Sequence, residues 1–382
     1  MLWASLILIA INLRPALTSV PTVVVQIQQE FGWNGATIGL LTTLPVLLMG
    51  VFALVVPAIA QRIGRTRTVT LAMVLVTFAV GVRVFAAHSL VLFVSAALAG
   101  IGIALATGLV PGIVREQMPH AMGRATGAWT ASLMAGAAIA SAITVPLALL
   151  WGSWQWALAV WAVPAAVALV VWRFAERTSV QHIRPATIIR IRELPWRNRI
   201  AWALTAFLTL NSIVFYSSLA WIAPSYAERG WTQSNAGWLF AVFAVAQVLS
   251  ALTLPALSQR TPYRRTLFAV TIVLTFVALI FIGWLPDFAP PLVLFALGYF
   301  LSGGFVMGLG LLSVLAPTAA AAARLTAMTL SVTYLTAASG PLIMGFIFDA
   351  LQSWTAIFTL LGLAALLQLV AIIPLRRGVS VN

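Results

Sequence analysis

The sequence predicts an all-α membrane protein in which twelve transmembrane helices form two six-helix repeats. Three observations predict this fold: a very apolar composition, twelve long apolar runs, and a similarity between the two halves of the chain. Of the 382 residues, 62% are hydrophobic and only 7% are charged. Soluble domains carry roughly 25% charged residues, so the composition excludes an ordinary soluble protein.

The apolar runs set the expected positions of the helices. A helix needs roughly 20 mainly apolar residues to cross about 30 Å of hydrocarbon. The first run lacks a preceding basic segment and a cleavage site, so we interpret it as a spanning helix rather than a signal peptide. The expected spans are 2–26, 35–60, 68–87, 90–114, 124–149, 154–173, 200–224, 234–258, 266–285, 291–316, 325–348 and 354–375.

Arginines between these runs predict the orientation. Cytoplasmic loops of membrane proteins are enriched in basic residues, and the arginines here occupy alternate connections. We therefore expect these connections and both termini in the cytoplasm of a bacterium, with the protein in its inner membrane. The same placement explains the formal charge of +14 without a nucleic-acid partner. The arginine-rich connections contain Arg62, Arg65, Arg67, Arg115, Arg124, Arg173 through Arg199, Arg260, Arg264, Arg265 and Arg324.

One long connection divides the chain into six spans plus six. We expect an N-terminal six-helix bundle at 1–175, a cytoplasmic linker at 176–198 and a C-terminal six-helix bundle at 199–382. The linker is rich in arginine, and we expect it to lie along anionic lipid headgroups. A regulatory site in the linker is the alternative.

The two halves repeat each other at a nearly constant spacing. EFGWNGATIGLL at 30–41 is matched by ERGWTQSNAGWL at 228–239, and PAIAQRIGRTRT at 57–68 by PALSQRTPYRRT at 255–266, both at an offset of 198. Ser153-Trp154 and Ser353-Trp354 align at an offset of 200. Because each half has an even number of spans, the repeats have parallel topology. That arrangement predicts a substrate site between the halves, near the middle of the membrane.

These features resemble the major facilitator superfamily over the whole chain. PAIAQRIGRTRT is similar to the superfamily's signature between helices 2 and 3. Arg62, Gly64 and Arg65 fit it, whereas Gln61 stands where an Asp is expected. The repeated motif in the second half contributes Gln259 and Arg260.

More narrowly, five segments resemble the cyanate permease family, whose members are associated with cyanate and with nitroimidazole-type compounds. The resemblance implies a transporter for a small molecule of one of these kinds. The segments are NLRPALTSV (12–20), GLLTTLP (39–45), GLVPGIVRE (108–116), NSIVFY (211–216) and SVTYLTAASGPLIMGFIFD (331–349).

Arg14 is the strongest candidate for substrate binding. It lies about twelve residues into the first span, close to the expected bilayer centre, where translocon scales set a cost of roughly 2.5–3.5 kcal/mol. No carboxylate lies at a similar depth in any span, so an anionic or strongly dipolar substrate would be its missing partner. Pro15 favours a kink beside it. The alternative is an Arg14 satisfied by carbonyls and water within its own half.

Other polar residues in the spans extend this candidate site. Thr18 shares a helix face with Arg14, and the offset of 198 maps these two residues onto Ser212 and Tyr216. Each candidate could equally be an ordinary interhelical hydrogen-bonding residue. The remaining candidates in the C-terminal half are Asn211, Gln247, Tyr299 and Tyr334.

Arg83 is expected near the outer end of the third span. It could snorkel to the interface or pair with Glu30 or Asp349 in an outer gate. A structural or gating role is favoured over substrate contact. The spans contain no buried acidic pair and no cluster with metal-ligand spacing, so we expect neither an enzyme, a cofactor nor a metal site.

The leading hypothesis is therefore a secondary transporter, working as a monomer, that moves a small anion such as cyanate by alternating access. An exporter of small neutral heteroaromatic compounds such as nitroimidazoles is the first alternative. A sensor or channel-like protein on the same fold is the second. Because every carboxylate falls in a loop or at the end of a span, we expect no central proton relay, with Asp349 as the best remaining candidate for protonation.

Overall fold

The computed structural model describes residues 2–117, 122–179, 191–261 and 263–375, and in this part of the chain the regular structure is helical. Twelve helical segments are long and apolar enough to cross a membrane among the described residues, as the sequence predicts. The first half contains α1 (Leu2–Leu13), α2 (Pro15–Thr22), α3 (Val24–Phe31), α4 (Gly35–Ile63), α5 (Arg65–Gly81), the 3₁₀ turn η1 (Val82–Phe85), α6 (Ser89–Gln117), α7 (Met122–Trp151), α8 (Trp154–Ala159) and α9 (Ala162–Ser179). After the 3₁₀ turn η3 (Ile191–Glu193), the second half contains α10 (Arg199–Glu228), α11 (Gln233–Arg260), α12 (Arg264–Trp284), α13 (Pro290–Val314), α14 (Ala319–Ala337), α15 (Ser339–Leu351) and α16 (Trp354–Ala371).

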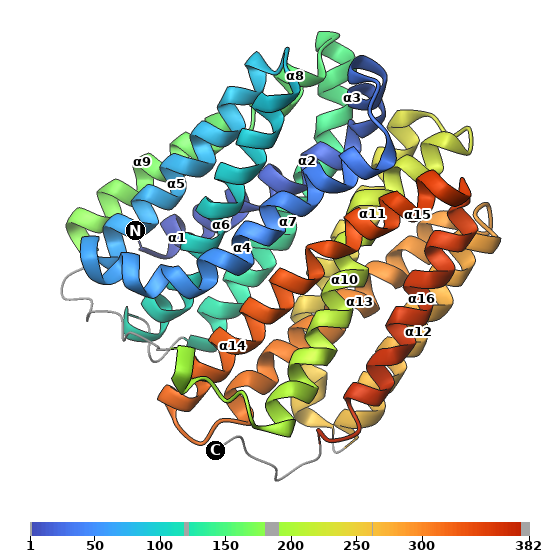
Figure 1. Ribbon diagram of the computed structural model, residues 1–382. Coiled ribbons are helices and arrows are strands. Elements are labelled where there is room, and N and C mark those ends of the chain that lie inside the picture. The colour runs from blue at the N-terminus through green and yellow to red at the C-terminus, as the bar shows by residue number, and fades with distance from the viewer. Residues whose placement is uncertain (1, 118–121, 180–190, 262, 376–382) are drawn as a thin grey trace.

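The two halves form two bundles that lie side by side (Figure 1). The N-terminal bundle, in blue to green, occupies the upper left of that view, and the C-terminal bundle occupies the lower right. Helix α4 packs on α14 and α15, and α7 packs on α11, so these contacts join the bundles. Each bundle has an apolar core of its own, and a third apolar cluster contains residues of both halves.

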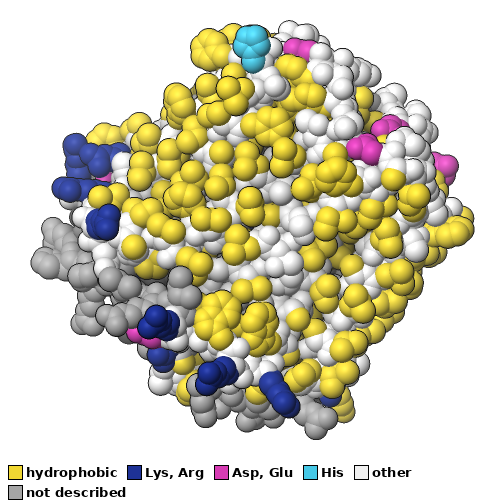
Figure 2. Space-filling view, in the orientation of Figure 1, with side chains coloured by type: hydrophobic (Ala, Val, Ile, Leu, Met, Phe, Trp, Pro, Cys, Tyr) yellow, Lys and Arg dark blue, Asp and Glu magenta, His cyan; other side chains and the backbone are white. Residues whose placement is uncertain are grey.

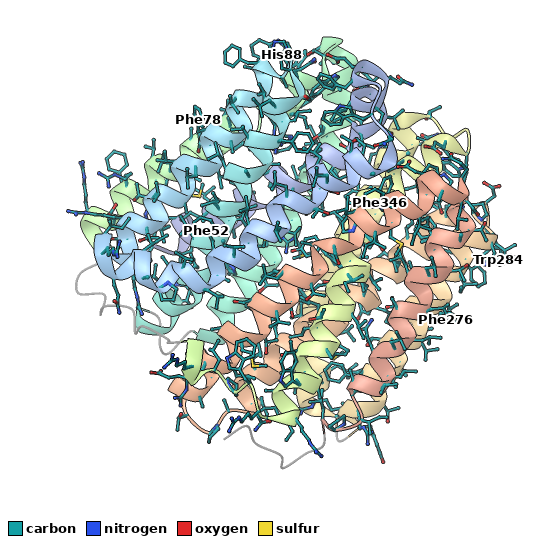
Figure 3. All side chains as sticks on the ribbon, in the orientation of Figure 1. Phe52, Phe78, His88, Phe276, Trp284 and Phe346 are labelled. Atoms are coloured by element: carbon teal, nitrogen blue, oxygen red, sulfur yellow. The ribbon has the colours of Figure 1, made fainter. Side chains whose placement is uncertain are left out.

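Large apolar side chains cover the outside of the bundles. Phe78, Trp284 and Phe346 point away from the helices (Figure 3) and are each more than half exposed. In water such a surface would be costly, at roughly 25 cal/mol for each Å² of apolar area. This surface is therefore suited to contact with lipid chains.

Charged side chains separate between the two ends of the helices. Arginines gather at the lower left of Figure 2, whereas acidic residues and a histidine lie at its upper and right edges. We name these two ends the arginine-rich end, where α4 meets α5, and the acidic end, where α4 begins.

The internal repeat is visible in matching contacts within the two halves. The Trp154 indole donates a hydrogen bond to the Glu30 carboxylate, and the Trp354 indole donates one of 3.0 Å to Glu228. Within each half, this hydrogen bond joins the end of the first span to the beginning of the sixth span. A left-handed glycine follows each of these glutamates by two residues, Gly32 (φ 65°) and Gly230 (φ 90°), where a side chain would be strained.

Three spans that the sequence predicts as continuous helices are broken in the structure. The first is interrupted at Arg14 and again at Val23, the sixth at Val160–Trp161, and the eleventh at Ala338. Pro15 explains the first break, because it has no N–H to donate to the carbonyl of Ile11. Hydropathy locates a span but does not show such a break.

The motif at the arginine-rich end is more helical than the expected loop. Gln61 and Arg62 belong to the last turn of α4, and Arg65 is the first residue of α5. Only Gly64 separates these helices, with a φ of 89° that favours glycine. In the second half, Gln259 and Arg260 are the last two residues of α11. The second and eighth helices therefore extend beyond the expected spans, which end at residues 60 and 258, and include these four residues.

Candidate functional site

A cavity of about 220 Å³ lies between the two bundles. Both halves contribute to its wall, as expected for two parallel repeats. The N-terminal half supplies Arg14, Met49, Ile103, Thr107, Trp129, Thr130, Leu133 and Met134. The C-terminal half supplies Ser212, Phe215, Tyr216, Gln247, Ser302, Phe305, Val306, Leu309, Leu330 and Tyr334.

The break between α1 and α2 positions Arg14 in this wall. The Arg14 backbone carbonyl accepts hydrogen bonds from the N–H groups of Leu17 (2.9 Å) and Thr18 (3.0 Å), which begins the new helix. Its guanidinium carbon lies 5.9 Å from the centre of the Phe215 ring, and Tyr216 lines the same cavity wall. The Arg14 side chain of one half thus contacts helix α10 of the other.

Arg14 is the charged member of the described cavity wall, and none of the wall residues is acidic. The carboxylates of Glu30, Glu228 and Asp349 bond to groups at the acidic end instead. Among the described residues the structure records one ion pair, Arg173 with Glu176 at the arginine-rich end. The positive charge of Arg14 is therefore not balanced by a described carboxylate.

Three polar side chains of the C-terminal half face the same cavity without a protein partner. Ser212, Gln247 and Ser302 are each less than 5% exposed, and within the described part of the chain none of their side chains makes a hydrogen bond. Most buried serines and threonines here donate to a helix carbonyl, as Ser141 does to Ala137 at 2.8 Å. Buried polar groups left unpaired are costly, so these groups are available to a ligand or to water.

Aromatic rings form much of the remaining surface. The rings of Tyr216 and Tyr334 pack edge to face, with their centres 6.4 Å apart. Phe215 lies against Tyr216 at 5.2 Å, while Trp129 and Phe305 line the wall from α7 and α13. The cavity is therefore apolar and aromatic, with one cation and a few uncommitted hydrogen-bonding groups, as is typical of small-molecule sites.

The profile of the Major Facilitator Superfamily matches residues 5–232. The chain belongs to this superfamily. The superfamily and the relatives below consist of transporters, so this protein is a multi-pass membrane transporter rather than an enzyme. The prediction of the fold class is thereby confirmed.

Curated relatives of this superfamily transporter match most of its length. It is 32% identical over 377 residues to the 2-nitroimidazole transporter of Escherichia coli (strain K12), covering 98% of this chain and 94% of that protein. It is also 32% identical over 302 residues to the cyanate transport protein CynX of the same organism, covering 78% and 77%. The uncharacterized transporter YycB of Bacillus subtilis (strain 168) is 32% identical over 368 residues, covering 95% and 90%.

A solved structure shares the fold at low sequence identity. It is a bacterial homologue of the human lysosomal transporter Spinster, in an inward-facing and unoccupied conformation. The TM-score is 0.74 at 14% identity, and the match covers 97% of this chain and 94% of the other.

In this superfamily transporter, five residues selected from the sequence meet in the cavity. They are Arg14, Ser212, Tyr216, Gln247 and Tyr334.

Three other candidates lie outside its lining. The Thr18 hydroxyl is 3.1 Å from the Arg14 carbonyl oxygen and 3.5 Å from that of Ala137. The Asn211 amide donates to the carbonyl of Leu301 and to Gln368. The Tyr299 hydroxyl bonds to that of Thr253 at 2.7 Å. These three side chains join helices to one another.

The expected pairing of Arg83 with Glu30 or Asp349 is wrong. Arg83 is 2% exposed, so it does not snorkel to the interface either. Its guanidinium donates to Ser95, Ser19 and the carbonyl of Ala16. The pairing fails because each carboxylate already has donors at the acidic end: Trp154 for Glu30, and the backbone of α4 for Asp349.

The sequence reasoning missed several wall residues, among them Trp129, Phe215, Ser302 and Phe305. Ser302 directly precedes a glycine-rich run whose tight packing the structure does show: a Cβ at Gly308 would lie 2.8 Å from the Leu208 side chain. Phe215 could have been found because it directly precedes Tyr216 in the sequence, and two neighbouring residues of one helix can both reach a wide cavity. Aromatic residues in spans are otherwise too common to single out.

Proposed function

We propose that this transporter moves a small anion such as cyanate by alternating access, with Arg14 as the residue that binds the anion. The observation that carries the proposal is the charge of Arg14 in the cavity wall, which lacks a described carboxylate partner. A guanidinium donates two parallel hydrogen bonds to an anion, and such charge-assisted bonds are strong in a low-dielectric site.

The rest of the cavity supports the same class of substrate. Ser212, Gln247 and Ser302 offer donors on the opposite bundle from Arg14, so a bound anion would contact both halves. A volume of about 220 Å³ suits a small substrate, since pockets for drug-sized ligands measure roughly 300–1,000 Å³. The likeness to the cyanate transport protein CynX agrees with this choice.

A small neutral heteroaromatic compound, such as a nitroimidazole, is the second candidate. The observation in its favour is the aromatic wall formed by Trp129, Phe215, Phe305 and Tyr334. A planar ring would pack on these side chains while a nitro oxygen accepts from Arg14. The likeness to the 2-nitroimidazole transporter agrees with it.

The transport cycle follows from the two-bundle architecture. We propose that the halves at 1–175 and 199–382 rock against each other as a monomer in the bacterial inner membrane, with the arginine-rich end in the cytoplasm. The linker between them would lie along the lipid headgroups. Import and export are both compatible with this cycle.

Binding and exchange by variants of Arg14 test the proposal. We expect saturable counterflow of radiolabelled cyanate in proteoliposomes, which separates a carrier from a channel or a sensor. Replacing Arg14→Gln removes about two charge-assisted hydrogen bonds and should weaken binding by a factor of at least about 100. Arg14→Lys should recover only part of it, because an ammonium lacks the planar fork.

Arg173→Gln is the matched control, because it removes an equal charge at the exposed arginine-rich end and should leave exchange unchanged. Normal cyanate exchange by Arg14→Gln would refute the proposed site. Thermal stabilisation of the parent by 2-nitroimidazole, without any effect of cyanate, would favour the second candidate instead.

A further inference from the structure

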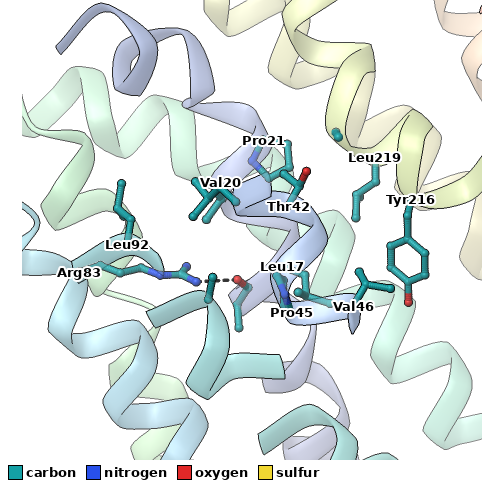
Figure 4. A pocket seen from close by; sticks show the side chains of 14 residues that line it. Leu17, Val20, Pro21, Thr42, Pro45, Val46, Arg83, Leu92, Tyr216 and Leu219 are labelled. Atoms are coloured by element: carbon teal, nitrogen blue, oxygen red, sulfur yellow. Dashed lines mark hydrogen bonds between the residues drawn. The ribbon is translucent and has the colours of Figure 1, made fainter. Parts of the chain in front are cut away.

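A second, smaller cavity lies beside Arg83 (Figure 4), and its wall does not include Arg14. Arg83 and Tyr216 face it from opposite sides. Its wall consists mainly of apolar residues from α2, α4, α6 and α10, with Thr42 as a further polar member. Tyr216 lines both cavities and therefore stands between them.

Arg83 has hydrogen-bonding capacity that the protein leaves unused. Its Nε donates to Ser95 (2.7 Å), one terminal nitrogen to the carbonyl of Ala16 (2.7 Å) and the other to Ser19 (3.4 Å). A guanidinium carries five N–H donors, so these three bonds leave two donors uncommitted. The side chain is only 2% exposed, and the uncommitted donors are on a group that lines the cavity.

The charge of Arg83 also lacks a described counterion. The carboxylates at the acidic end bond elsewhere: Glu30 to Trp154, Glu228 to Trp354 and Asp349 to the backbone of α4. An unbalanced buried charge is expensive in an apolar surrounding. A hydrogen-bonding anchor alone would be supplied more cheaply by a neutral side chain, whereas an anion would use both the charge and the two remaining donors.

The size of the cavity limits what it can hold. Its volume is about 30 Å³, and a water molecule needs roughly 10–15 Å³ by the same measure. There is room for two or three heavy atoms, which is the size of a triatomic anion and too little for an imidazole ring. The apolar wall of Leu17, Val20 and Leu92 would exclude competing water and strengthen the pairing.

We propose that Arg83 forms a second binding station for a small linear anion, between the acidic end and the Arg14 cavity. This inference rests on the proposed function, because it assigns the same substrate class to a second point on one path. Helix α2 connects the stations physically: it begins directly after Arg14, and its Ala16 and Ser19 hold the Arg83 guanidinium. An anion that moves from one station to the other would pass the side chain of Tyr216.

Equilibrium binding of radiolabelled cyanate to the purified full chain tests the second station. The chain has neither lysine nor cysteine, so no side-chain amine or thiol would be carbamylated during the measurement. We expect two bound anions per chain for the parent, one for Arg83→Gln, one for Arg14→Gln and none for the double variant.

Two alanine variants, one that fills the small cavity and one control, test the second station even if Arg83→Gln does not fold. Ala96 lines the small cavity, whereas its neighbour Ala97 does not. Ala96→Val should lower the affinity of the second site at least tenfold while retaining one anion at Arg14. Ala97→Val should bind two anions like the parent, and thermal unfolding should confirm that both variants are folded.

The outcomes separate this inference from the proposed function. A parent that binds one anion, lost in Arg14→Gln and retained in folded Arg83→Gln or Ala96→Val, overturns the second station and leaves the proposed function intact. One anion lost only in Arg83→Gln supports the second station and refutes the site at Arg14. No binding to the parent overturns both.

Discussion

Arg14 and Arg83 show two ways in which a membrane protein accommodates a buried guanidinium. Arg83 uses three of its donors on serine hydroxyls and a carbonyl, which fixes its position against α2. Arg14 lies over the Phe215 ring across the interface between the halves, beside Tyr216 in the cavity wall. The two residues therefore differ in freedom: Arg83 is held by its own half, whereas the surroundings of Arg14 change when the halves move.

Thr18 and Gln247 provide a test of which polar side chains contact substrate. We expect Gln247→Leu to weaken cyanate binding about 10- to 150-fold, because the amide lines the cavity and a lost hydrogen bond to a charged group costs roughly 1.5–3 kcal/mol. Thr18→Val should leave affinity within about twofold, because its hydroxyl bonds to backbone carbonyls. Isothermal titration of both folded variants would measure this. Equal losses in the two would contradict the boundary of the site.

The site residues that could be predicted from the sequence were those marked by a charge or by the internal repeat. Arg14 could be predicted because a charge inside a span needs a reason, and Ser212 and Tyr216 followed from it through the repeat. Helical periodicity placed Thr18 on the same face, but it cannot distinguish a face that lines a cavity from one that packs on α7. Ser302 and Trp129 carry no charge, and their role depends on how helices of two halves meet.

At the scale of elements, the break in the first span is accompanied by a glycine of α7, Gly136, that packs against it. Pro15 leaves the Ile11 carbonyl without its usual helical donor, and Gly136 packs directly over that carbonyl. A Cβ at Gly136 would lie 2.8 Å from the Ile11 carbonyl carbon, which real side chains do not tolerate. The glycine therefore lets α1 and α7 approach closely where Arg14 leaves the helix.

We expect Gly136→Val to lower the thermal unfolding midpoint strongly or to prevent folding, because the contact is with backbone and cannot relax by a rotamer change. Overpacking commonly costs about 1–3 kcal/mol. Gly127→Ala on the same helix is the control, since a Cβ there would meet nothing within 4 Å. Fluorescence-detected size exclusion with a thermal ramp would measure both. A Gly136→Val protein as stable as the parent would show that α1 can shift freely.

The pattern of elements was largely predictable, and the sequence also indicated a kink at Pro15, whereas the breaks in the sixth and eleventh spans were not predicted. The repeat at offsets of 198 and 200 corresponds in the structure to the paired contacts Glu30–Trp154 and Glu228–Trp354, although the sequence predicted only the repeat and not these contacts. The break at Ala338 precedes Pro341, which has no N–H to donate to the Ala337 carbonyl. It lies where the Thr43 hydroxyl of the other half donates to the Ala338 carbonyl at 2.6 Å, a contact between distant segments that local sequence does not reveal.

At the scale of the whole molecule, Asp349 joins the halves at the acidic end. Its two carboxylate oxygens accept from the N–H groups of Gly35 and Ala36, each at 2.9 Å, at the first turn of α4. A carboxylate at a helix N-terminus satisfies free donors and interacts favourably with the helix dipole. Nearby, a Cβ at Gly39 would lie 2.8 Å from the backbone of Leu342, so the helices are in close contact there.

We expect Asp349→Asn to favour separation of the halves at this end, because the amide has one acceptor oxygen and no charge. A loss of about 1–2 kcal/mol would shift the population roughly 5- to 30-fold. The cysteine-free chain permits spin-label pairs at Leu150 with Phe288 and at Ile63 with Tyr263, which are exposed at the two ends. The first distance should lengthen and the second shorten. Unchanged distances in the variant would rule out Asp349 as a clamp.

The driving force for transport depends on whether side chains of the protein can carry a proton. Proton-coupled carriers commonly relay protons through buried acidic or histidine side chains, and the described wall of the Arg14 cavity contains none. We therefore expect facilitated diffusion, exchange, or symport in which a proton travels with a weakly acidic substrate. Asp349 is the remaining candidate for protonation, although two backbone donors already hold its carboxylate.

Liposomes containing a pH-sensitive dye can distinguish these modes. Cyanate is the anion of a weak acid, whereas thiocyanate is a linear anion that stays charged throughout the accessible pH range. A chain without a central relay should take up protons with cyanate only, or with neither anion, and should exchange thiocyanate without a pH change. Proton uptake driven by thiocyanate and abolished in Asp349→Asn would instead make Asp349 a proton carrier. The clamp between the halves would then open upon protonation, which would couple the rocking motion directly to the pH gradient.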